Sequence, residues 1–358
     1  MLPLPPAPIG LIFQVMFKSS SLLLLPLLSL SADTPRVAHG VGRELVRTHE
    51  VSSARSIDSA TLSFLGQEQD VGSGTERSKT LSLVVEDKIV AAADGAPLKF
   101  SRGFAVVSSE ADAGEVEGTE VRTSSGPSEL EGLGVIFTRD AADEEWACEY
   151  DEESDGEAAW LDELTPGMEL SSILPEADVA VGDSWEVPVS ILGDLLRPGG
   201  AVDVTSPEDV DVPEGGIAIA VPSGPKDGGW DSFEGDIVAR YESIDEEDGR
   251  RAKIVLTLEL SSELDQAAEL EAAAAERGVE ETYSEATLNR DLSGEVVILW
   301  DLIGHHALSA EGTLTGSNQF YAAWTINGPM EIELEYEEEG SLEYEISMEV
   351  EATGGKAD

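Results

Sequence analysis

The loop at residues 151–156 carries residue types that bind hard cations. Asp151, Glu153 and Asp155 occupy alternate positions, Gly156 follows them, and Asp162 lies where a calcium loop has its twelfth residue. Carboxylates at positions 1, 3 and 5 before a glycine suit calcium coordination by oxygen ligands. Glu at the third position and the short Asp at the twelfth depart from that pattern. A calcium site at these four residues is therefore one hypothesis, and a solvated acidic loop is the alternative.

His305 and His306 are the next residues that could bind a metal. Adjacent residues on a strand point to opposite faces, so one ion could not contact both without a turn. The preceding Ile303-Gly304 pair predicts such a turn. Because His39 and His49 are distant in the sequence, no set of three ligands is evident.

The chain offers little that predicts catalysis. Cys148 is its only cysteine, and the neighbouring Glu145 and Glu149 disfavour the thiolate that a nucleophile needs. Alternation with Trp146 and Tyr150 instead predicts a small apolar residue on a strand. The sequence contains neither a Gly-x-Ser-x-Gly elbow nor a phosphate-binding glycine loop. We therefore expect a protein that is not an enzyme and has no organic cofactor.

The net charge excludes whole classes of partner. The 358 residues include 73 acidic and 21 basic side chains, for a formal charge of −52. Such a surface repels phosphate backbones and anionic lipid headgroups, so we expect no binding to nucleic acid. Residues 36–139 carry a net charge of only −5, whereas residues 140–358 carry −47. A solvated acidic surface explains this excess more simply than dedicated cation binding does.

Residues 16–32 have the layout of a secretory signal: one basic residue, Lys18, a short apolar run, and small residues before Ala32. The run contains Pro26 and is too short to span a bilayer. We expect a signal peptide over residues 1–31, with Met16 as the alternative start. The mature chain is then periplasmic or extracellular and has no transmembrane span.

Short runs of alternating apolar and polar residues dominate the mature chain and predict antiparallel strands. Early examples are residues 80–85, 100–107, 134–139, 237–244 and 252–260. Towards the C-terminus we expect five further strands, at residues 296–302, 307–314, 319–326, 330–336 and 342–350. Asn327-Gly328 and Glu339-Gly340-Ser341 are the expected turns among them.

One helix is predicted over residues 262–277, between a capping pattern at Ser262 and the terminator Gly278. The predicted regions are a β-rich region at 40–196, a Pro/Gly-rich linker at 197–229 and an antiparallel β region at 230–352. The fold class is mainly β: one or more antiparallel meander sheets in a curved half-barrel or a sandwich, with one substantial helix.

The segment Leu174–Val187 contains Leu174-Pro175 and then Val181-Gly182-Asp183-Ser184-Trp185. It resembles exported bacterial β-rich proteins of unknown function. The resemblance covers about residues 140–190 and 230–352, and it implies an exported all-β domain without implying a reaction.

These features favour an exported acidic protein that acts as a non-enzymatic binding or envelope-associated module. Its partner is unknown and could be an apolar ligand or an envelope protein. One alternative is a periplasmic carrier of an apolar, lipid-like or lipoprotein-like ligand. Its apolar face would comprise Trp300, Phe320, Tyr321, Trp324 and Ile326. The other alternative is an extracytoplasmic hydrolase in which His305 or His306 contacts a serine and a carboxylate.

Overall fold

A computed structural model describes residues 34–71, 74–93, 95–112, 115–116, 119–120, 124–139, 145–175, 177–202, 230–246, 249–276, 278–327 and 331–353. The chain divides into two compact units, Met1–Ala32 and Asp33–Asp358. All that follows concerns the second unit. The expected signal segment at residues 1–31 lies outside the described residues, as does the expected linker from residue 203 onwards.

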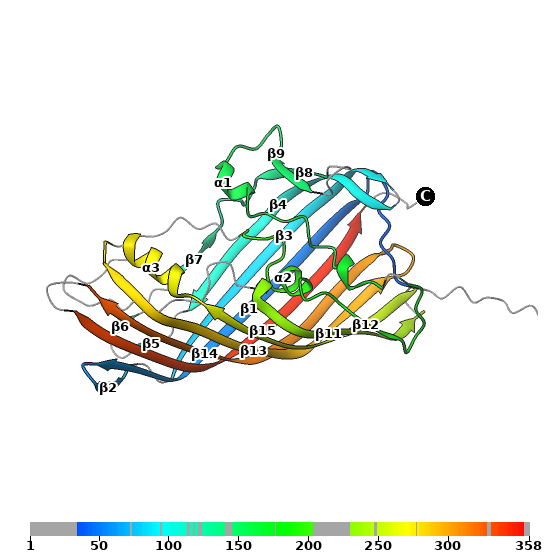
Figure 1. Cartoon of the computed structure of the whole chain (residues 1–358). Helices are drawn as coiled ribbons and strands as arrows, with labels where there is room; N and C mark the ends of the chain where they lie inside the picture. The colour runs from blue at the N-terminus through cyan, green and yellow to red at the C-terminus, as the bar shows by residue number, and fades with distance from the viewer. Residues whose placement is uncertain are drawn as a thin grey trace, which may run out of the picture. The chain divides into compact units, whose positions relative to one another are not determined.

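The second unit is mainly β, as predicted. Its large sheet has the strand order β10-β11-β12-β13-β14-β15-β1-β3-β4-β8-β9, with β2 paired to β1 and β7 paired to β4 (Figure 1). The strands of this sheet are β1 (Glu44–Phe64), β2 (Gln67–Asp70), β3 (Thr75–Ala93), β4 (Ala96–Asp112), β7 (Ser124–Pro127), β8 (Gly134–Arg139), β9 (Trp146–Tyr150), β10 (Ser184–Glu186), β11 (Phe233–Asp245), β12 (Arg251–Asp265), β13 (Glu281–Asp301), β14 (His306–Ile326) and β15 (Ile332–Thr353). A separate two-stranded sheet contains β5 (Glu115–Val116) and β6 (Thr119–Glu120).

The described helical elements are short apart from one. They are α1 (Ala158–Leu161), the 3₁₀ turn η1 (Ser171–Ile173), α2 (Ile191–Leu196), the 3₁₀ turn η2 (Trp230–Ser232) and α3 (Ala267–Glu276). All neighbouring strands pair antiparallel, and β1 pairs with β15 along nearly its whole length. The strands before and after residues 203–229 therefore belong to the same sheet.

The five C-terminal strands predicted from the sequence are three long ones in the structure. The turn expected at Glu339–Ser341 is wrong, because these residues lie within β15 and pair with β1 and β14. Gly340 lets the backbones of β15 and β1 pack closely, because a Cβ atom at this position would lie 2.0 Å from the carbonyl oxygen of Ser56. A glycine inside a strand can thus mark close approach of two backbones and not a turn.

The predicted helix begins later than expected. Ser262 is still in β12, where it pairs with Arg290, and the α-helix starts at Ala267. The side chain that contacts the start of the helix is that of Asp265, not Ser262: its carboxylate accepts a hydrogen bond from the Ala267 amide at 3.0 Å. Gly278 has a φ of 75° just beyond the helix, as expected of a terminating glycine.

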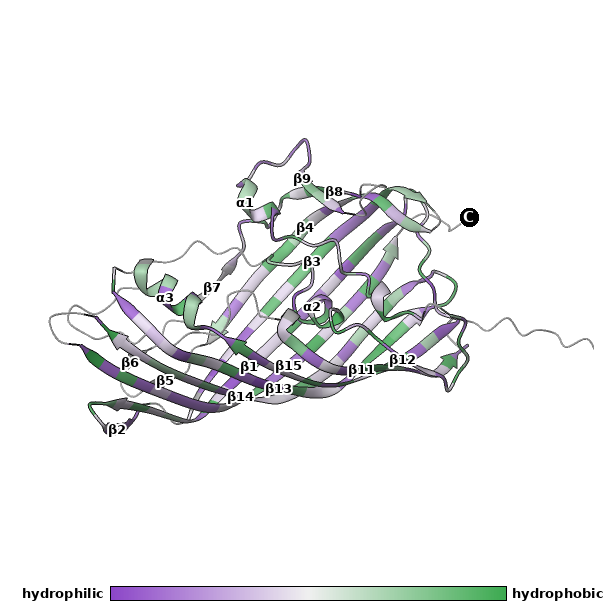
Figure 2. Ribbon diagram, viewed as in Figure 1, coloured by the Kyte–Doolittle hydropathy of each residue, from purple (hydrophilic) through white to green (hydrophobic). Residues whose placement is uncertain are grey.

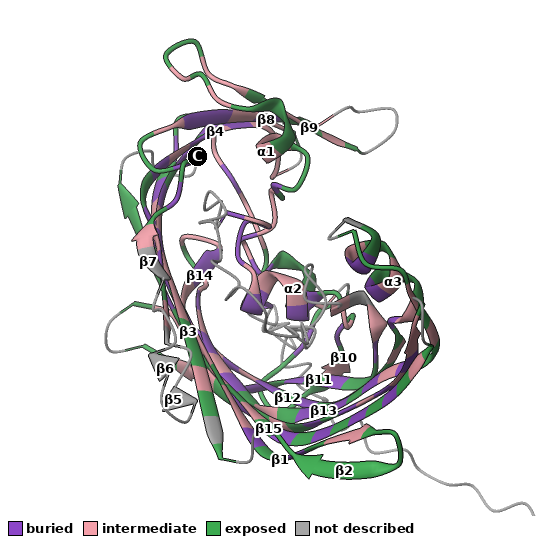
Figure 3. Ribbon diagram, turned by 90° about the vertical axis from the view of Figure 1, so that its left-hand side faces the viewer, coloured by how far each residue is buried: buried purple, intermediate pink, exposed green. Residues whose placement is uncertain are grey.

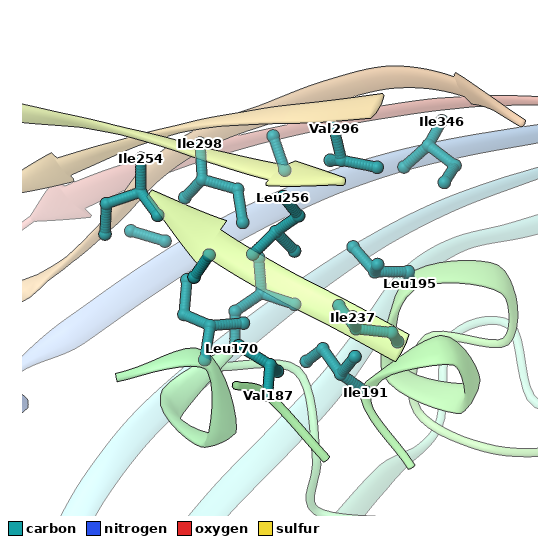
Figure 4. Close-up of a cluster of buried hydrophobic side chains, with 14 of the residues drawn as sticks. Leu170, Val187, Ile191, Leu195, Ile237, Ile254, Leu256, Val296, Ile298 and Ile346 are labelled. Atoms are coloured by element: carbon teal, nitrogen blue, oxygen red, sulfur yellow. The ribbon is translucent and has the colours of Figure 1, made fainter. Parts of the chain in front are cut away.

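One face of the sheet is buried and the other is exposed, as the alternating hydropathy along the strands predicts (Figure 2). The sheet is open and curves around α2, which lies on its concave side (Figure 3). Ile191 and Leu195 of α2 belong to the same buried cluster as Ile254, Ile298 and Ile346 of the sheet (Figure 4). Burial of the apolar side chains of this cluster stabilises the unit.

Two smaller clusters complete the core. One joins β3, β4, β8 and β9 to residues 164–168, around Phe100, Phe104 and Phe137. The other lies beneath α3, where Leu270 packs with Phe320 and Trp324. The cluster around Phe100, Phe104 and Phe137 contributes Phe100 and Trp146 to one wall of the pocket described next.

Candidate functional site

A pocket of about 350 Å³ opens between the turn joining β3 to β4, the ends of β8 and β9, residues 166–171, and α2. Val37, Arg139, Trp146 and Asp194 also line it. Its volume is within the range typical of small-molecule sites. We call it the Asp194 pocket.

Aromatic side chains form one wall of the Asp194 pocket. Trp146, partly buried on β9, contacts Phe100 edge-on with ring centroids 5.5 Å apart, and Phe100 stacks on Phe137 at 4.9 Å. The guanidinium of Arg102 lies over both phenylalanine rings, 5.3 and 5.2 Å from their centroids. These contacts fix the orientation of the wall, as edge-to-face and cation–π arrangements do.

Asp194, on α2, also lines the pocket. The apolar residues of this helix, Ile191, Leu192, Leu195 and Leu196, are buried in the core and hold the helix in place. The Asp194 carboxylate lies against Gly167, where a Cβ atom would come within 2.5 Å of its Oδ1. Burial raises the pKa of Asp194 to about 6. Within the described part of the chain, no hydrogen bond or ion pair to this carboxylate is present.

Glu169 is the second carboxylate of the pocket, and its environment differs. His39 Nε2 lies 3.0 Å from Glu169 Oε2, and Arg47 Nη2 lies 3.6 Å from Oε1. Burial opposes ionisation, but the hydrogen bond from His39 and the charges of His39 and Arg47 outweigh it and lower the pKa of Glu169. Two carboxyl groups with oppositely shifted pKa values therefore line one pocket.

A buried ionic network supports this side of the pocket. Asp87 accepts hydrogen bonds from Arg102 Nε at 2.8 Å and Arg102 Nη2 at 3.0 Å, and it also pairs with Arg47. Burial opposes the charge of Asp87, but both arginines lower its pKa. Arg102 also donates to the carbonyl oxygens of Thr165 and Pro166 at 3.1 and 3.2 Å. The network thereby ties the segment before Gly167 to the sheet.

Leu170 has a backbone conformation that non-glycine residues rarely adopt. Its φ is 51° and its ψ is 24°, and its side chain is buried in the main core. Such a conformation costs on the order of 1 kcal/mol and persists where packing imposes it. Here it lies between Glu169 and Ser171, two residues that line the pocket.

The calcium hypothesis concerns a different region. Asp151, Glu153 and Asp155 lie in the loop after β9, and Asp162 follows α1. Asp151 Oδ1 accepts a hydrogen bond from the Glu153 amide at 3.1 Å. Among the described residues, no group of three or more His, Cys, Asp or Glu side chains is arranged to hold a metal ion. Calcium binding at these four residues stays a prediction.

The first of the two adjacent histidines, His305, lies in the turn that precedes β14, as predicted. His305 has a φ of 56°, and His306 begins β14. Arg43 Nη2 donates to His306 Nδ1 at 2.7 Å, and burial and this arginine lower the pKa of His306 to about 4. In the described part of the chain, neither histidine is hydrogen-bonded to a serine, the arrangement that the hydrolase alternative needs.

Cys148 alternates with Trp146 and Tyr150 on the half-buried face of β9, as predicted. Burial and the charge of Glu149 raise the pKa of its thiol to about 11, so the thiolate is scarce at neutral pH.

The apolar face suggested for a carrier is largely covered. Trp300 is 0% exposed in the main core, and its indole donates to the Arg36 carbonyl at 3.1 Å. Phe320 and Trp324 are buried with Leu270 of α3, and Ile326 packs against the same cluster. Tyr321 belongs to the opposite face of β14. Four of the five residues therefore belong to or pack against the core, which removes the continuous apolar face that would have favoured a carrier.

Sequence reasoning did not identify the Asp194 pocket, because its walls come from segments that no motif connects. The available signal was Asp194 itself, an acidic residue within Ile191-Leu192-Gly193-Asp194-Leu195-Leu196. A charged residue in a run with no other polar side chain is unusual in a core and indicates a functional or paired group.

Comparisons with known proteins assign no family. No family model matches the chain, and no curated protein matches it. Among solved structures, an outer membrane channel from Pseudomonas putida F1 aligns over 88% of this chain and 98% of its own, at 8% identity and a TM-score of 0.24. The outer membrane protein OprG from Pseudomonas aeruginosa aligns over 88% and 98%, at 9% identity and a TM-score of 0.20. Likenesses this low carry no argument about function. In the described residues, no helix has the length and apolar character needed to cross a membrane.

Proposed function

We propose that this chain is an exported, non-enzymatic binding protein and that its ligand is a small organic molecule held in the Asp194 pocket. The observation that carries the proposal is the combination of a cavity of about 350 Å³, an aromatic wall at Trp146 and the Asp194 carboxylate, which has no partner among the described residues. Binding sites are commonly apolar cavities with a few polar groups that orient the ligand.

Binding is favoured over hydrolysis by the surroundings of the titratable groups. Glu169 is held by His39 and Arg47, and His306 is held by Arg43. A general base needs a free electron pair directed at a substrate. Glu169 and His306 instead direct these atoms at partners within the protein, and among the described residues no histidine lines the cavity beside Asp194.

Export is part of the proposal and is supported by the signal-like segment at residues 16–32. The acidic surface is also consistent with an exported protein that must stay dispersed. An envelope-associated role would be compatible with the same pocket, since a binding protein can deliver its ligand to an envelope partner.

The first experiment is native mass spectrometry on the protein isolated gently from its own exported fraction. It reports the start of the mature chain and any retained mass together. We expect a chain that begins near Ala32 and carries a retained organic mass of up to a few hundred daltons. A thermal-shift series with organic amines, sugars and carboxylates then tests which compounds stabilise the protein.

Two neighbouring substitutions locate the site. Ser171 lines the pocket, whereas Ser172, the next residue of η1, is exposed and does not line it. Ser171→Trp should fill part of the cavity and abolish both the retained mass and the thermal shift, while Ser172→Trp should preserve them. A protein with no retained mass and no stabilising compound, or ligand binding that survives Ser171→Trp, would contradict the proposal.

A further inference from the structure

We infer that the ligand of the Asp194 pocket is a small organic ammonium ion with an apolar body, for which Asp194 is the counter-ion and Trp146 the contacting wall. This inference rests on the proposed function and specifies the chemical class of its ligand. It follows from the charges around the cavity and from which of them are already neutralised.

The charged groups of the cavity are Asp194, Glu169 and Arg139. Glu169 is compensated by His39 and Arg47, and only 19% of its side chain is exposed. Arg139, at the end of β8, has an interaction partner of its own. Asp194 has no such compensation among the described residues. Asp194 is therefore the carboxylate of the pocket whose charge a cationic ligand can offset.

A cationic ligand satisfies this carboxylate better than a neutral or anionic one does. Charge-assisted hydrogen bonds between ammonium and carboxylate are about twice as strong as neutral ones, and a partly desolvated site strengthens them further. Apolar atoms next to the ammonium can lie against Trp146, where the ring face also attracts a cation. An anionic ligand would instead be repelled by Asp194, whose charge no cation offsets among the described residues.

The field of the whole molecule acts in the same direction. A formal charge of −52 raises the local concentration of cations and speeds their encounter with the protein. The same field opposes the approach of anions, so an anionic ligand is disfavoured both at a distance and at the site.

Binding of an ammonium ion should depend on pH in a defined window. Burial raises the pKa of Asp194 to about 6, so below that pH the carboxyl is largely neutral and a proton must leave for the ion pair to form. The other charged groups that line the cavity are Glu169 and Arg139, and Arg197 at the C-terminal end of α2 contacts Glu163 at 3.4 Å. We expect affinity to fall by about tenfold between pH 7 and pH 5.

The test compares 2-phenylethylamine with 2-phenylethanol, which is nearly identical in shape but neutral. Isothermal titration calorimetry on the full mature chain at pH 7.5 should show at least tenfold tighter binding of the amine. Asp194→Asn should bring the two affinities within about threefold. Asp236→Asn, which removes an exposed carboxylate on β11, is the matched control and should keep the preference. Trp146→Leu should weaken the binding of both compounds.

The outcomes separate this inference from the proposed function. Equal affinities for amine and alcohol, or a preference that survives Asp194→Asn, would overturn the ammonium ligand while leaving the pocket as a binding site. The same holds if neither probe binds and the natively isolated protein retains a neutral or anionic mass. If no probe binds and no mass is retained, both the inference and the proposed function fail.

Discussion

Asp194 is a carboxylate whose buried environment disfavours its own charge. It follows Gly193 in a helix whose other side chains are apolar and buried, and no cation offsets its desolvation in the described part of the chain. A carboxyl with a folded pKa near 6 and an unfolded value near 3.9 makes folding less favourable at neutral pH. Residues retained at such a cost are candidates for function.

Asp194→Asn should therefore stabilise the protein at neutral pH. Between pH 4 and pH 6 the folded wild type binds more protons than the unfolded chain, so its stability falls as the pH rises through this window. The wild-type penalty is then fully present above pH 6. We expect the variant to gain on the order of 2 kcal/mol in unfolding free energy at pH 7.5 and much less at pH 4.

Urea denaturation at the two pH values measures this difference, with Asp236→Asn as the exposed control. A gain that does not depend on pH, or a loss at pH 7.5, would show that Asp194 is not destabilised by its burial. Ligand must be removed first, because a bound cation would lower the pKa and hide the effect.

The face of a strand on which a side chain lies could be predicted where apolar and polar residues alternate in the sequence. Trp146, Cys148 and Tyr150 share a face of β9 as expected. The partners of Asp87 could not be predicted, because Arg47 and Arg102 reach it from neighbouring strands whose register no local pattern specifies. The Asp194 pocket was missed for the same reason.

The elements were predicted in type but not in length. Alternation identifies strands over residues 307–314 and 319–326, yet both belong to β14, which has 21 residues. Strands in globular proteins usually have 3 to 10 residues, so a polar or glycine-containing interval reads as a turn. In a long curved sheet, the same interval can continue the strand.

Gly340 illustrates what the structure requires at such an interval. Its backbone pairs with β1 and β14, and the space a side chain would occupy is filled by the Ser56 carbonyl. Gly340→Ala must therefore displace β1 or β15 locally. We expect a loss of about 2 kcal/mol in unfolding free energy, as overpacking usually causes, measured by urea denaturation.

Gly126→Ala on β7 is the matched control, because no atom lies within 4 Å of the Cβ position there. Its unfolding free energy should stay within about 0.5 kcal/mol of the wild type. Equal effects of the two substitutions would show that the close approach of β15 to β1 is not what Gly340 accommodates.

At the scale of the whole molecule, the large sheet pairs two strands that are far apart in the sequence, β1 and β15. β1 and β15 pair from Glu44–Thr353 to Phe64–Leu334, a separation of about three hundred residues in sequence. Hairpin meanders follow from local turns, but pairing between the two ends of the chain depends on the full set of strands. The sequence therefore predicted the meander and the mainly β class, not the single sheet.

The exposed face of this sheet concentrates the acidic charge. Along β15 the exposed positions are mostly glutamate, and alternate residues on one face are about 7 Å apart. These glutamates are Glu333, Glu335, Glu337, Glu339, Glu343, Glu345, Glu349 and Glu351. Neighbouring charges thus lie within one Debye length, about 10 Å at 0.1 M salt, and repel one another.

Added salt should consequently stabilise the protein. We expect the melting temperature to rise by several degrees between 10 mM and 500 mM sodium chloride, and equally in potassium chloride, because screening does not depend on the identity of the cation. Calcium chloride at matched ionic strength separates screening from specific binding. If the loop at Asp151 to Asp162 binds calcium, millimolar calcium should add a further rise that Asp155→Asn removes and Asp236→Asn retains. A melting temperature that is constant or falls with salt would show that repulsion across the acidic face does not limit stability.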